Sequence, residues 1–279
     1  MNRLLPFAIV FLLAACVPAG SPLGAGFRFS TYGAPQGRAP EYWLSVGQRM
    51  AANFTGAAPQ TIWIVGNVFG DGTYLNFPCE TDLPDITCGF VDMNEAYLKS
   101  FDENGVRVWL QVEAGNADML ELIDLVLGQY SHHPSVIGFG VDVEWYQSPQ
   151  GALGVPVTDA VARAWVEAVR RHNPDYRLFL KHWDSAWMPP TYRDGIVFIN
   201  DSQQFDNLEA LLADFTAWGA YFSPSPVGYQ FGYPADRPWW NELDNPPGTI
   251  GQAILTAIPN TESLFWVDFT VDQVFPELP

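Results

Sequence analysis

Short apolar runs alternate with amphipathic stretches along almost the whole chain, and this alternation constrains the fold more than any other feature. Strand-like runs are expected at residues 27–32, 61–65, 106–112, 136–143, 177–182, 196–199, 220–222 or 228–231, and 264–269. Helical periodicity is expected at residues 42–54, 92–103, 116–130, 158–171, 206–218 and 249–258. Eight strands that alternate with helices predict a (β/α)8 TIM barrel of the α/β class. The alternative is an open doubly wound sheet, but no glycine-rich phosphate loop follows the first run.

The first 25 residues are typical of an export signal followed by a tether. Arg3 precedes an apolar stretch, residues 4–13, that is too short to cross a bilayer. Leu13-Ala14-Ala15-Cys16 then resembles the lipobox of bacterial lipoproteins, and the alternative is an ordinary secretory signal. The resemblance implies that residues 1–15 are a signal peptide and that Cys16 carries a lipid. It also implies a location in the cell envelope, and Val17 after the cysteine favours the outer membrane. Residues 16–25 are expected to be a flexible tether and residues 26–279 the barrel domain.

Two further cysteines, Cys79 and Cys88, lie close together in sequence. In an exported chain such a pair is expected to form a disulfide bond. A metal pair is disfavoured because no histidine lies near these cysteines, and all four lie between residues 132 and 182. No His/Asp cluster has the spacing of metal ligands, so we expect no metal. We also expect no cofactor.

The charge of the chain argues against negatively charged partners. The formal net charge is −18, which argues against binding to nucleic acid or to an anionic membrane surface. The chain also contains eleven tryptophans and eleven tyrosines. Some of these must fill the core, but the excess suits a cleft that stacks on flat sugar rings.

The fourth strand-like run ends in two acids, Asp142 and Glu144. Residues i and i+2 of a strand point to the same side, about 6.5–7 Å apart. Burying two carboxylates there is costly unless they are paired or act on something. One interpretation is a buried ion network with Lys181 or Arg177, and the other is an active site.

Other strand ends add polar and aromatic candidates at the same mouth, where barrels of this type place their active residues. The candidates for binding a substrate are Gln111, Tyr146, Lys181, Trp183, Asn200, Gln230, Tyr233, Trp266 and Asp268, and Glu113 is a third candidate for catalysis. Acids, amides and aromatics favour carbohydrate chemistry over phosphate chemistry, which requires Arg, Lys or a glycine nest.

The stretch Gly138-Phe-Gly-Val-Asp142-Val-Glu144-Trp-Tyr146 resembles the fourth-strand signature of family 18 glycoside hydrolases, D-G-x-D-x-D-x-E. Gly138, Asp142 and Glu144 match, whereas Ile137 and Gly140 stand where the family has its first two aspartates. Trp266 is similar to the tryptophan that floors the family's sugar site, and the family's M-x-Y-D pattern is absent. The resemblance implies a chitinase-like barrel in which Glu144 is the general acid and Asp142 orients an N-acetyl group.

A substrate without an N-acetyl group requires a second carboxylate, and Glu113 is the candidate for nucleophile or base because it ends the neighbouring strand. Lys181 offers a different chemistry, a Schiff base of the aldolase type. His182 is interpreted as a rim histidine, and His132-His133 as structural.

Two functions remain from these patterns. The first is a lipid-anchored glycoside hydrolase that acts on a polysaccharide or glycan. The alternative is a non-catalytic glycan-binding lipoprotein built on a degenerate barrel, because two of the family's aspartates are missing. In both cases the partners are a carbohydrate and, through the lipid, a membrane.

Overall fold

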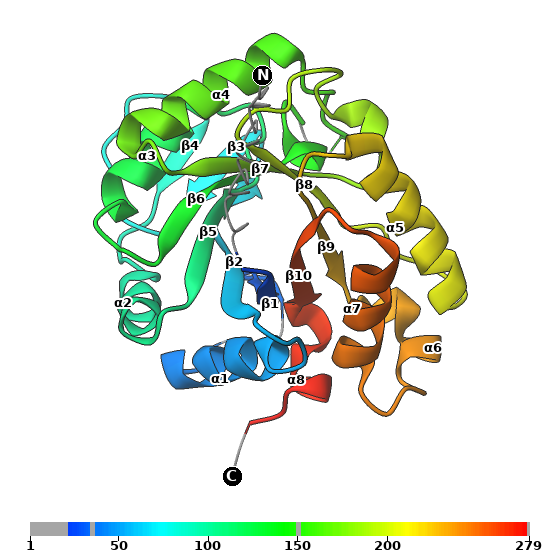
Figure 1. The fold of residues 1–279 in the computed structure, drawn as a ribbon. Coiled ribbons are helices and arrows are strands. Elements are labelled where there is room, and N and C mark those ends of the chain that lie inside the picture. Colours follow the sequence, from blue (N-terminus) through cyan, green and yellow to red (C-terminus); the bar gives the residue numbers. More distant parts are fainter. Residues whose placement is uncertain (1–21, 34–36, 149–151, 278–279) are drawn as a thin grey trace, which may run out of the picture.

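The computed structural model describes residues 22–33, 37–148 and 152–277, and in these residues eight parallel strands form a closed barrel (Figure 1). The strands follow one another around the barrel in chain order, and the last pairs with the first. They are β1 (Gly24–Phe29), β2 (Ala58–Phe69), β5 (Arg107–Val112), β6 (Val136–Asp142), β7 (Arg177–Lys181), β8 (Ile196–Asn200), β9 (Val227–Phe231) and β10 (Thr261–Val267). The predicted (β/α)8 barrel is confirmed.

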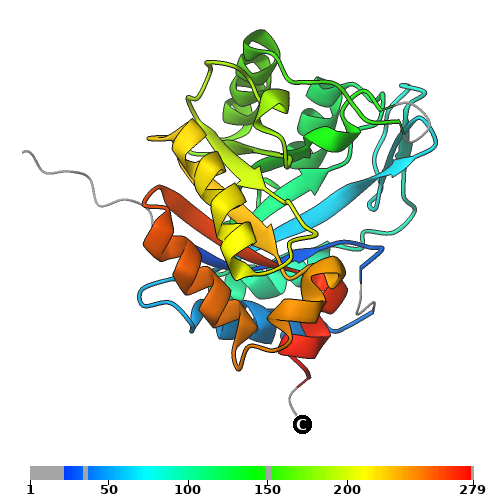
Figure 2. The same cartoon turned by 90° about the vertical axis from the view of Figure 1, so that its right-hand side faces the viewer.

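Helices cover the outside of the barrel, and Figure 2 shows two of them, α5 and α7, running beside each other along the wall. The helices are α1 (Pro40–Ala51), α2 (Glu95–Asn104), α3 (Met119–Tyr130), α4 (Asp159–His172), α5 (Leu208–Phe222), α6 (Arg237–Trp240), α7 (Pro246–Ala257) and α8 (Val271–Val274). Between β7 and β8 the described chain has only a 3-10 turn, Ser185–Trp187. The Pro189-Pro190 pair that follows cannot continue a helix, because proline lacks the required N–H.

Polar side chains fix where the helices begin. Thr158 accepts a hydrogen bond from the backbone N–H of Val161 and so caps α4. Asp118 caps α3 by accepting from two backbone N–H groups. The predicted cap was Asn116, but the cap is Asp118, two residues later, because its side chain reaches the free N–H groups.

Aromatic rings fill the barrel interior below the mouth. Trp109 of β5 and Phe179 of β7 are fully buried and meet edge to face, with ring centroids 5.6 Å apart. The glycines of β6 make room for them: a Cβ at Gly138 would lie 2.5 Å from the Trp109 ring, and one at Gly140 would lie 2.1 Å from the Phe179 ring. The barrel is therefore a packed core, and a ligand can enter only at its mouth.

The structure departs from the predicted elements in three places. β1 begins at Gly24, so the last two residues of the predicted tether belong to the barrel. The second strand is longer than predicted and turns back into β3 (Gly72–Leu75), which pairs with β4 (Ile86–Cys88). The seventh strand is Val227–Phe231, whereas residues 220–222 continue α5 because Phe222 packs into the core.

Cys79 and Cys88 form a disulfide bond, as predicted, with their Cα atoms 5.3 Å apart. The bridge closes the loop that leads into β4. The predicted signal peptide and Cys16 lie outside the described residues. Within the described ranges, no helix is both long enough and apolar enough to cross a membrane.

Replacing Cys79 and Cys88 with alanine is expected to lower the free energy of unfolding. The two cysteines are nine residues apart, and for so short a loop the chain-entropy model gives a loss of about 2–3 kcal/mol. Urea denaturation of the oxidised wild type and the double variant measures this difference. Reduced wild type serves as the control and should match the variant. An unchanged free energy of unfolding would mean that the loop is held by other contacts.

Candidate active site

A pocket of about 400 Å³ opens at the carboxyl ends of the strands, where a barrel of this type places its active site. Its walls carry four acids, two basic residues and several aromatic side chains. The lining residues are Arg28, Tyr32, Val68, Glu113, Asp142, Glu144, Trp145, Lys181, Asp201, Gln203, Tyr233 and Phe269. All three predicted catalytic carboxylates, Glu113, Asp142 and Glu144, therefore meet at one pocket.

Lys181 lies between two of the acids. Its ammonium is 2.7 Å from Asp142 Oδ2 and also bonds Asp201 Oδ2, and all three residues are buried. Burial favours the neutral amine, but the charges of Asp142 and Asp201 raise the pKa of Lys181 well above its ordinary value. A Schiff-base lysine must lose its proton, so this arrangement does not suit the aldolase chemistry considered for Lys181.

Asp142 is therefore the ion-pair partner of Lys181, as one interpretation of the sequence held. Its Oδ2 contacts the ammonium, while its Oδ1 is buried and has no hydrogen-bond partner among the described residues. Burial raises the pKa of Asp142; Lys181 opposes this rise, and Asp201 and Glu113 reinforce it. The carboxylates outnumber the cations here, and a proton or a ligand donor can satisfy the free oxygen.

Glu144 is in a different situation. It lies in a 3-10 turn, Val143–Trp145, directly after β6 and is only half-buried. Among the described residues, no Lys or Arg nitrogen lies within ion-pair distance of its carboxylate. Burial raises the pKa of Glu144; the charge of Lys181 opposes this rise, and Asp201 and Glu113 add to it. A carboxyl group with these properties is suited to hold a proton and give it to a bound molecule.

Glu113 follows β5, the strand next to β6, and both of its oxygens are held in place. The Tyr32 hydroxyl donates to Oε1, and the backbone N–H of Val68 donates to Oε2 at 3.2 Å. The side chain is 5% exposed, at the wall of the pocket. Two donors that fix the carboxyl group in one orientation suit a nucleophile or a positioned base.

A second hollow of about 360 Å³ adjoins the first. It is lined by Glu144, Trp183, Asp201, Ser202, Gln203 and Gln204, so three of its residues also line the main pocket. Trp183 is 40% exposed, and its indole stacks on the buried ring of His182, with the ring centroids 4.1 Å apart. Glu144 thus stands where the two hollows meet, and Trp183 offers an aromatic face in the outer one.

His182, interpreted from the sequence as a rim histidine, is buried directly after β7. Burial lowers its pKa to about 4. Its ring is stacked between Trp183 and Trp187, and Nδ1 accepts a hydrogen bond from the backbone N–H of Asp184. The histidine supports the position of Trp183.

Four other predicted residues lie in or beneath the pocket. Tyr233 lines it and donates to Gln230 Oε1 at 3.3 Å, while Gln230 and Gln111 are fully buried. Asp268 pairs with Arg28 at 2.9 Å and accepts two hydrogen bonds from Ser30. Asp268 therefore holds Arg28 in the pocket wall and does not line the pocket itself.

Three predicted residues point away from the mouth. Trp266 is fully buried outside the barrel wall, against Trp240, and its Nε1 donates to Thr270. Asn200 bonds Asp214 of α5, and Tyr146 packs edge-on against Trp165 of α4. The predicted sugar-floor role of Trp266 does not hold, because this residue lies on the outer face of β10. Asn200 and Tyr146 do not line the pocket at the barrel mouth.

The same alternation brings in residues that the sequence reading missed. Asp201 follows Val197 and Ile199, which face the barrel interior, so its inward direction could have been read from that period. Arg28 is an inward residue of β1 by the same rule. Tyr32 and Gln203 lie on loops, where no period applies.

No family model matches this sequence, and no curated protein matches it. Similar solved structures include a candidate alpha-L-fucosidase from Bacteroides thetaiotaomicron, with 14% identity and a TM-score of 0.56 over 95% of this chain and 92% of that one. A beta-D-glucuronidase of Dictyoglomus thermophilum has 12% identity and a TM-score of 0.53 over 88% of this chain and 43% of that one. An endocellulase from Pyrococcus horikoshii has 13% identity and a TM-score of 0.50 over 88% and 83%. These neighbours are glycoside hydrolases, and the likeness shows that the chain has their barrel fold.

Proposed function

We propose that this protein is a glycoside hydrolase that cleaves a polysaccharide or glycan bound across the two hollows at the barrel mouth. The observation that carries the proposal is the position of Glu144: a half-buried acid, without a cationic partner among the described residues, at the junction of two hollows. A glycosidic bond placed there has one sugar on each side of the acid. The fold shared with glycosidases supports the same class of reaction.

The proposed reaction uses two carboxylates. Glu144 gives its proton to the glycosidic oxygen while the bond from that oxygen to the anomeric carbon breaks. Glu113 takes a proton from the water that attacks the anomeric carbon, or it attacks that carbon itself. In the second case water then cleaves the glycosyl ester, and Glu144 takes the proton from that water. The hydrogen bonds from Tyr32 and Val68 fix the position of Glu113, which fits either role.

The N-acetyl-assisted route of family 18 is a weaker fit to this site. Asp142, which matches the aspartate that orients the N-acetyl group in that family, is engaged by Lys181. The space of a side chain at position 140 is filled by the ring of Phe179. We therefore assign the second carboxylate to Glu113, with Asp142 and Lys181 as groups that position the substrate.

The contact of Asp142 with Lys181 and the filled space at position 140 also favour a second candidate, a glycan-binding protein without activity. Incubation of the wild-type protein with a panel of polysaccharides and glycans, with detection of new reducing ends, separates the two functions. The enzyme releases product from at least one substrate. Saturable binding with no product from any substrate would support the binding protein.

The pH dependence of the reaction should report the proton of Glu144. The acid works only when protonated, so kcat/KM falls as the pH rises through its pKa. Because that pKa is raised from 4.5, the alkaline limb of the profile is expected above the ordinary range of glutamate. Initial rates between pH 4 and pH 9 measure it. A limb at the ordinary glutamate value, or none at all, would contradict the assignment.

We further propose that the protein is anchored through a lipid on Cys16, at the outer membrane of a bacterial envelope. The proposal is supported by the lipobox-like run Leu13-Ala14-Ala15-Cys16. Cys16→Ser is expected to move the protein from the membrane fraction to the soluble fraction, whereas a Cys79→Ala/Cys88→Ala variant stays with the membrane. Continued membrane association of Cys16→Ser would refute the anchor.

A further inference from the structure

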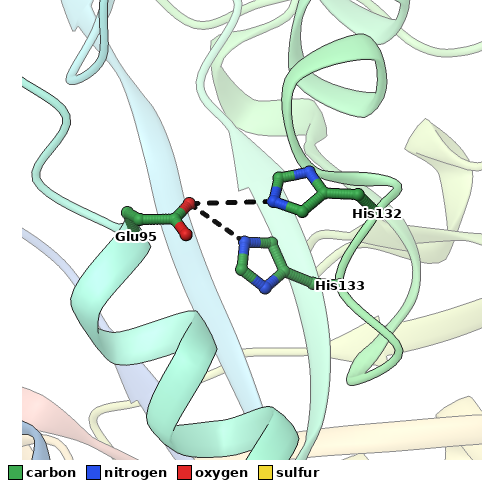
Figure 3. A group of neighbouring side chains, drawn as sticks. All are labelled: Glu95, His132 and His133. Atoms are coloured by element: carbon green, nitrogen blue, oxygen red, sulfur yellow. Dashed lines mark hydrogen bonds and ion pairs between the residues drawn. The ribbon is translucent and has the colours of Figure 1, made fainter.

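Three potential metal ligands meet on the barrel's outer layer, away from the residues that line the pocket. Glu95 is the first residue of α2, and His132 and His133 lie in the turn between α3 and β6. Figure 3 shows the three side chains converging, with both imidazoles directed toward the Glu95 carboxylate. One ligand atom from each lies within 4.8 Å of the others.

The two separations from Glu95 suit a small divalent ion. Nε2 of His133 is 3.1 Å from Glu95 Oε2, and Nε2 of His132 is 3.9 Å from the same oxygen. Zinc binds nitrogen and oxygen ligands at about 2.0–2.2 Å, so two ligands in a tetrahedral site stand roughly 3.4 Å apart. The observed distances lie on either side of this value, and His132 and Glu95 are exposed enough to adjust.

The second ring nitrogen of His133, Nδ1, contacts a carboxylate, as is usual for a histidine that binds a metal. His133 is 3% exposed, and its Nδ1 lies 2.6 Å from Asp102 Oδ2. The remaining oxygen of Asp102 accepts the backbone N–H of Ser135 at 2.9 Å. The contacts with Ser135 and His133 fix the position of Asp102, and Asp102 in turn orients the His133 ring.

Nε2 of His133 faces the Glu95 carboxylate at 3.1 Å. This nitrogen can donate a proton to Glu95 or bind a metal ion that Glu95 also binds. Nε2 of His132 lies beside the same carboxylate oxygen and offers a second nitrogen ligand.

We propose that Glu95, His132 and His133 bind one divalent transition-metal ion of the Zn²⁺ type, with Asp102 positioning His133. Two imidazoles and one carboxylate match the ligands that Zn²⁺ uses and do not match the all-oxygen sites of Ca²⁺ and Mg²⁺. The exposed side leaves a coordination position for water. The ion joins α2 to the turn before β6, so its role is to stabilise the outer layer of the barrel and is independent of the proposed hydrolysis.

The test is calorimetric titration of the untagged, metal-free chain with ZnCl₂ and, separately, with CaCl₂. Wild type is expected to bind one Zn²⁺ per chain and no Ca²⁺ at this site. His132→Ala, at a side chain that is 60% exposed, should fold normally and lose at least tenfold in Zn²⁺ affinity. Asp102→Asn should lose about 10–100-fold. His172→Ala, on α4, is the matched control and should bind as wild type does.

The chain is strongly acidic, so the experiment must distinguish this site from general cation binding. Binding of Zn²⁺ should weaken on acidification, because imidazole must be unprotonated to coordinate a metal. Equal Zn²⁺ affinity in His132→Ala and wild type would overturn the proposal. That result would assign His133 to a protonated clamp between Asp102 and Glu95.

Discussion

Glu144→Gln is expected to lower kcat/KM on a polysaccharide substrate by about 10²–10⁴-fold, the usual contribution of a general acid. Glutamine keeps the shape of the side chain but has no proton to give to the leaving oxygen. The variant should still bind the substrate, because Trp183, Asp201 and Gln203 remain in the two hollows. Steady-state kinetics together with a binding measurement separate the two effects.

The leaving group provides a sharper form of this experiment. The dinitrophenolate group of a dinitrophenyl glycoside leaves without needing a proton. Glu144→Gln should therefore slow hydrolysis of this substrate far less than hydrolysis of a natural linkage. Glu113→Gln should impair both substrates, because its role does not depend on the leaving group. Glu103→Gln, at an exposed position of α2, is the matched control and should be neutral. Equal losses on both substrates in Glu144→Gln would remove the general-acid role.

Lys181→Met is expected to lower the free energy of unfolding by about 3–5 kcal/mol at a pH above the raised pKa of Asp142, where that carboxyl group is ionised. The substitution removes the ammonium that lies against Asp142 and Asp201 and leaves two buried carboxylates without their cation. Urea denaturation measures the loss. Lys99, the only other lysine of the chain, is exposed on α2. Lys99→Met is therefore the control and should change stability little. A loss below about 1 kcal/mol would mean that the three groups do not form a buried ion network.

The pH dependence of Lys181→Met follows from the same charges. Burial raises the pKa of Asp142 in the folded chain above that of the unfolded chain, so the folded chain binds the proton more readily. The penalty is therefore complete above the raised pKa and shrinks as the pH falls toward the unfolded value of about 3.9. Asp142→Asn should cost less than Lys181→Met, because Lys181 keeps Asp201 as a partner.

The alternation of strands and helices was sufficient to predict the barrel, because each strand run is short, apolar and separated from the next by a helix or a break. The β3–β4 extension escaped this reading, since its strands are short and carry polar residues. At residues 220–222 the apolar run fits a strand or a helix equally well. Packing of Trp218 and Phe222 into the core decides for the helix.

The candidate site was predictable only where the residue pattern determines side-chain direction. Asp142 and Glu113 were found because they end consecutive strands, and Trp266 was misplaced because its neighbours on β10 give no sign of which face is inward. The inward direction of Arg28 and Asp201 follows from the alternation along β1 and β8, but their ion-pair partners do not. Those partners depend on the register of strands around the barrel, which the sequence alone does not state.

A crystal structure of the Glu144→Gln variant with a bound oligosaccharide would show directly whether the residue at position 144 meets a glycosidic bond. We predict a glycosidic oxygen within about 2.6–3.2 Å of the side chain at position 144. One sugar should lie beside Asp142 and Glu113, and the next should lie against Trp183. An oligosaccharide whose glycosidic bonds all lie away from position 144 would contradict it.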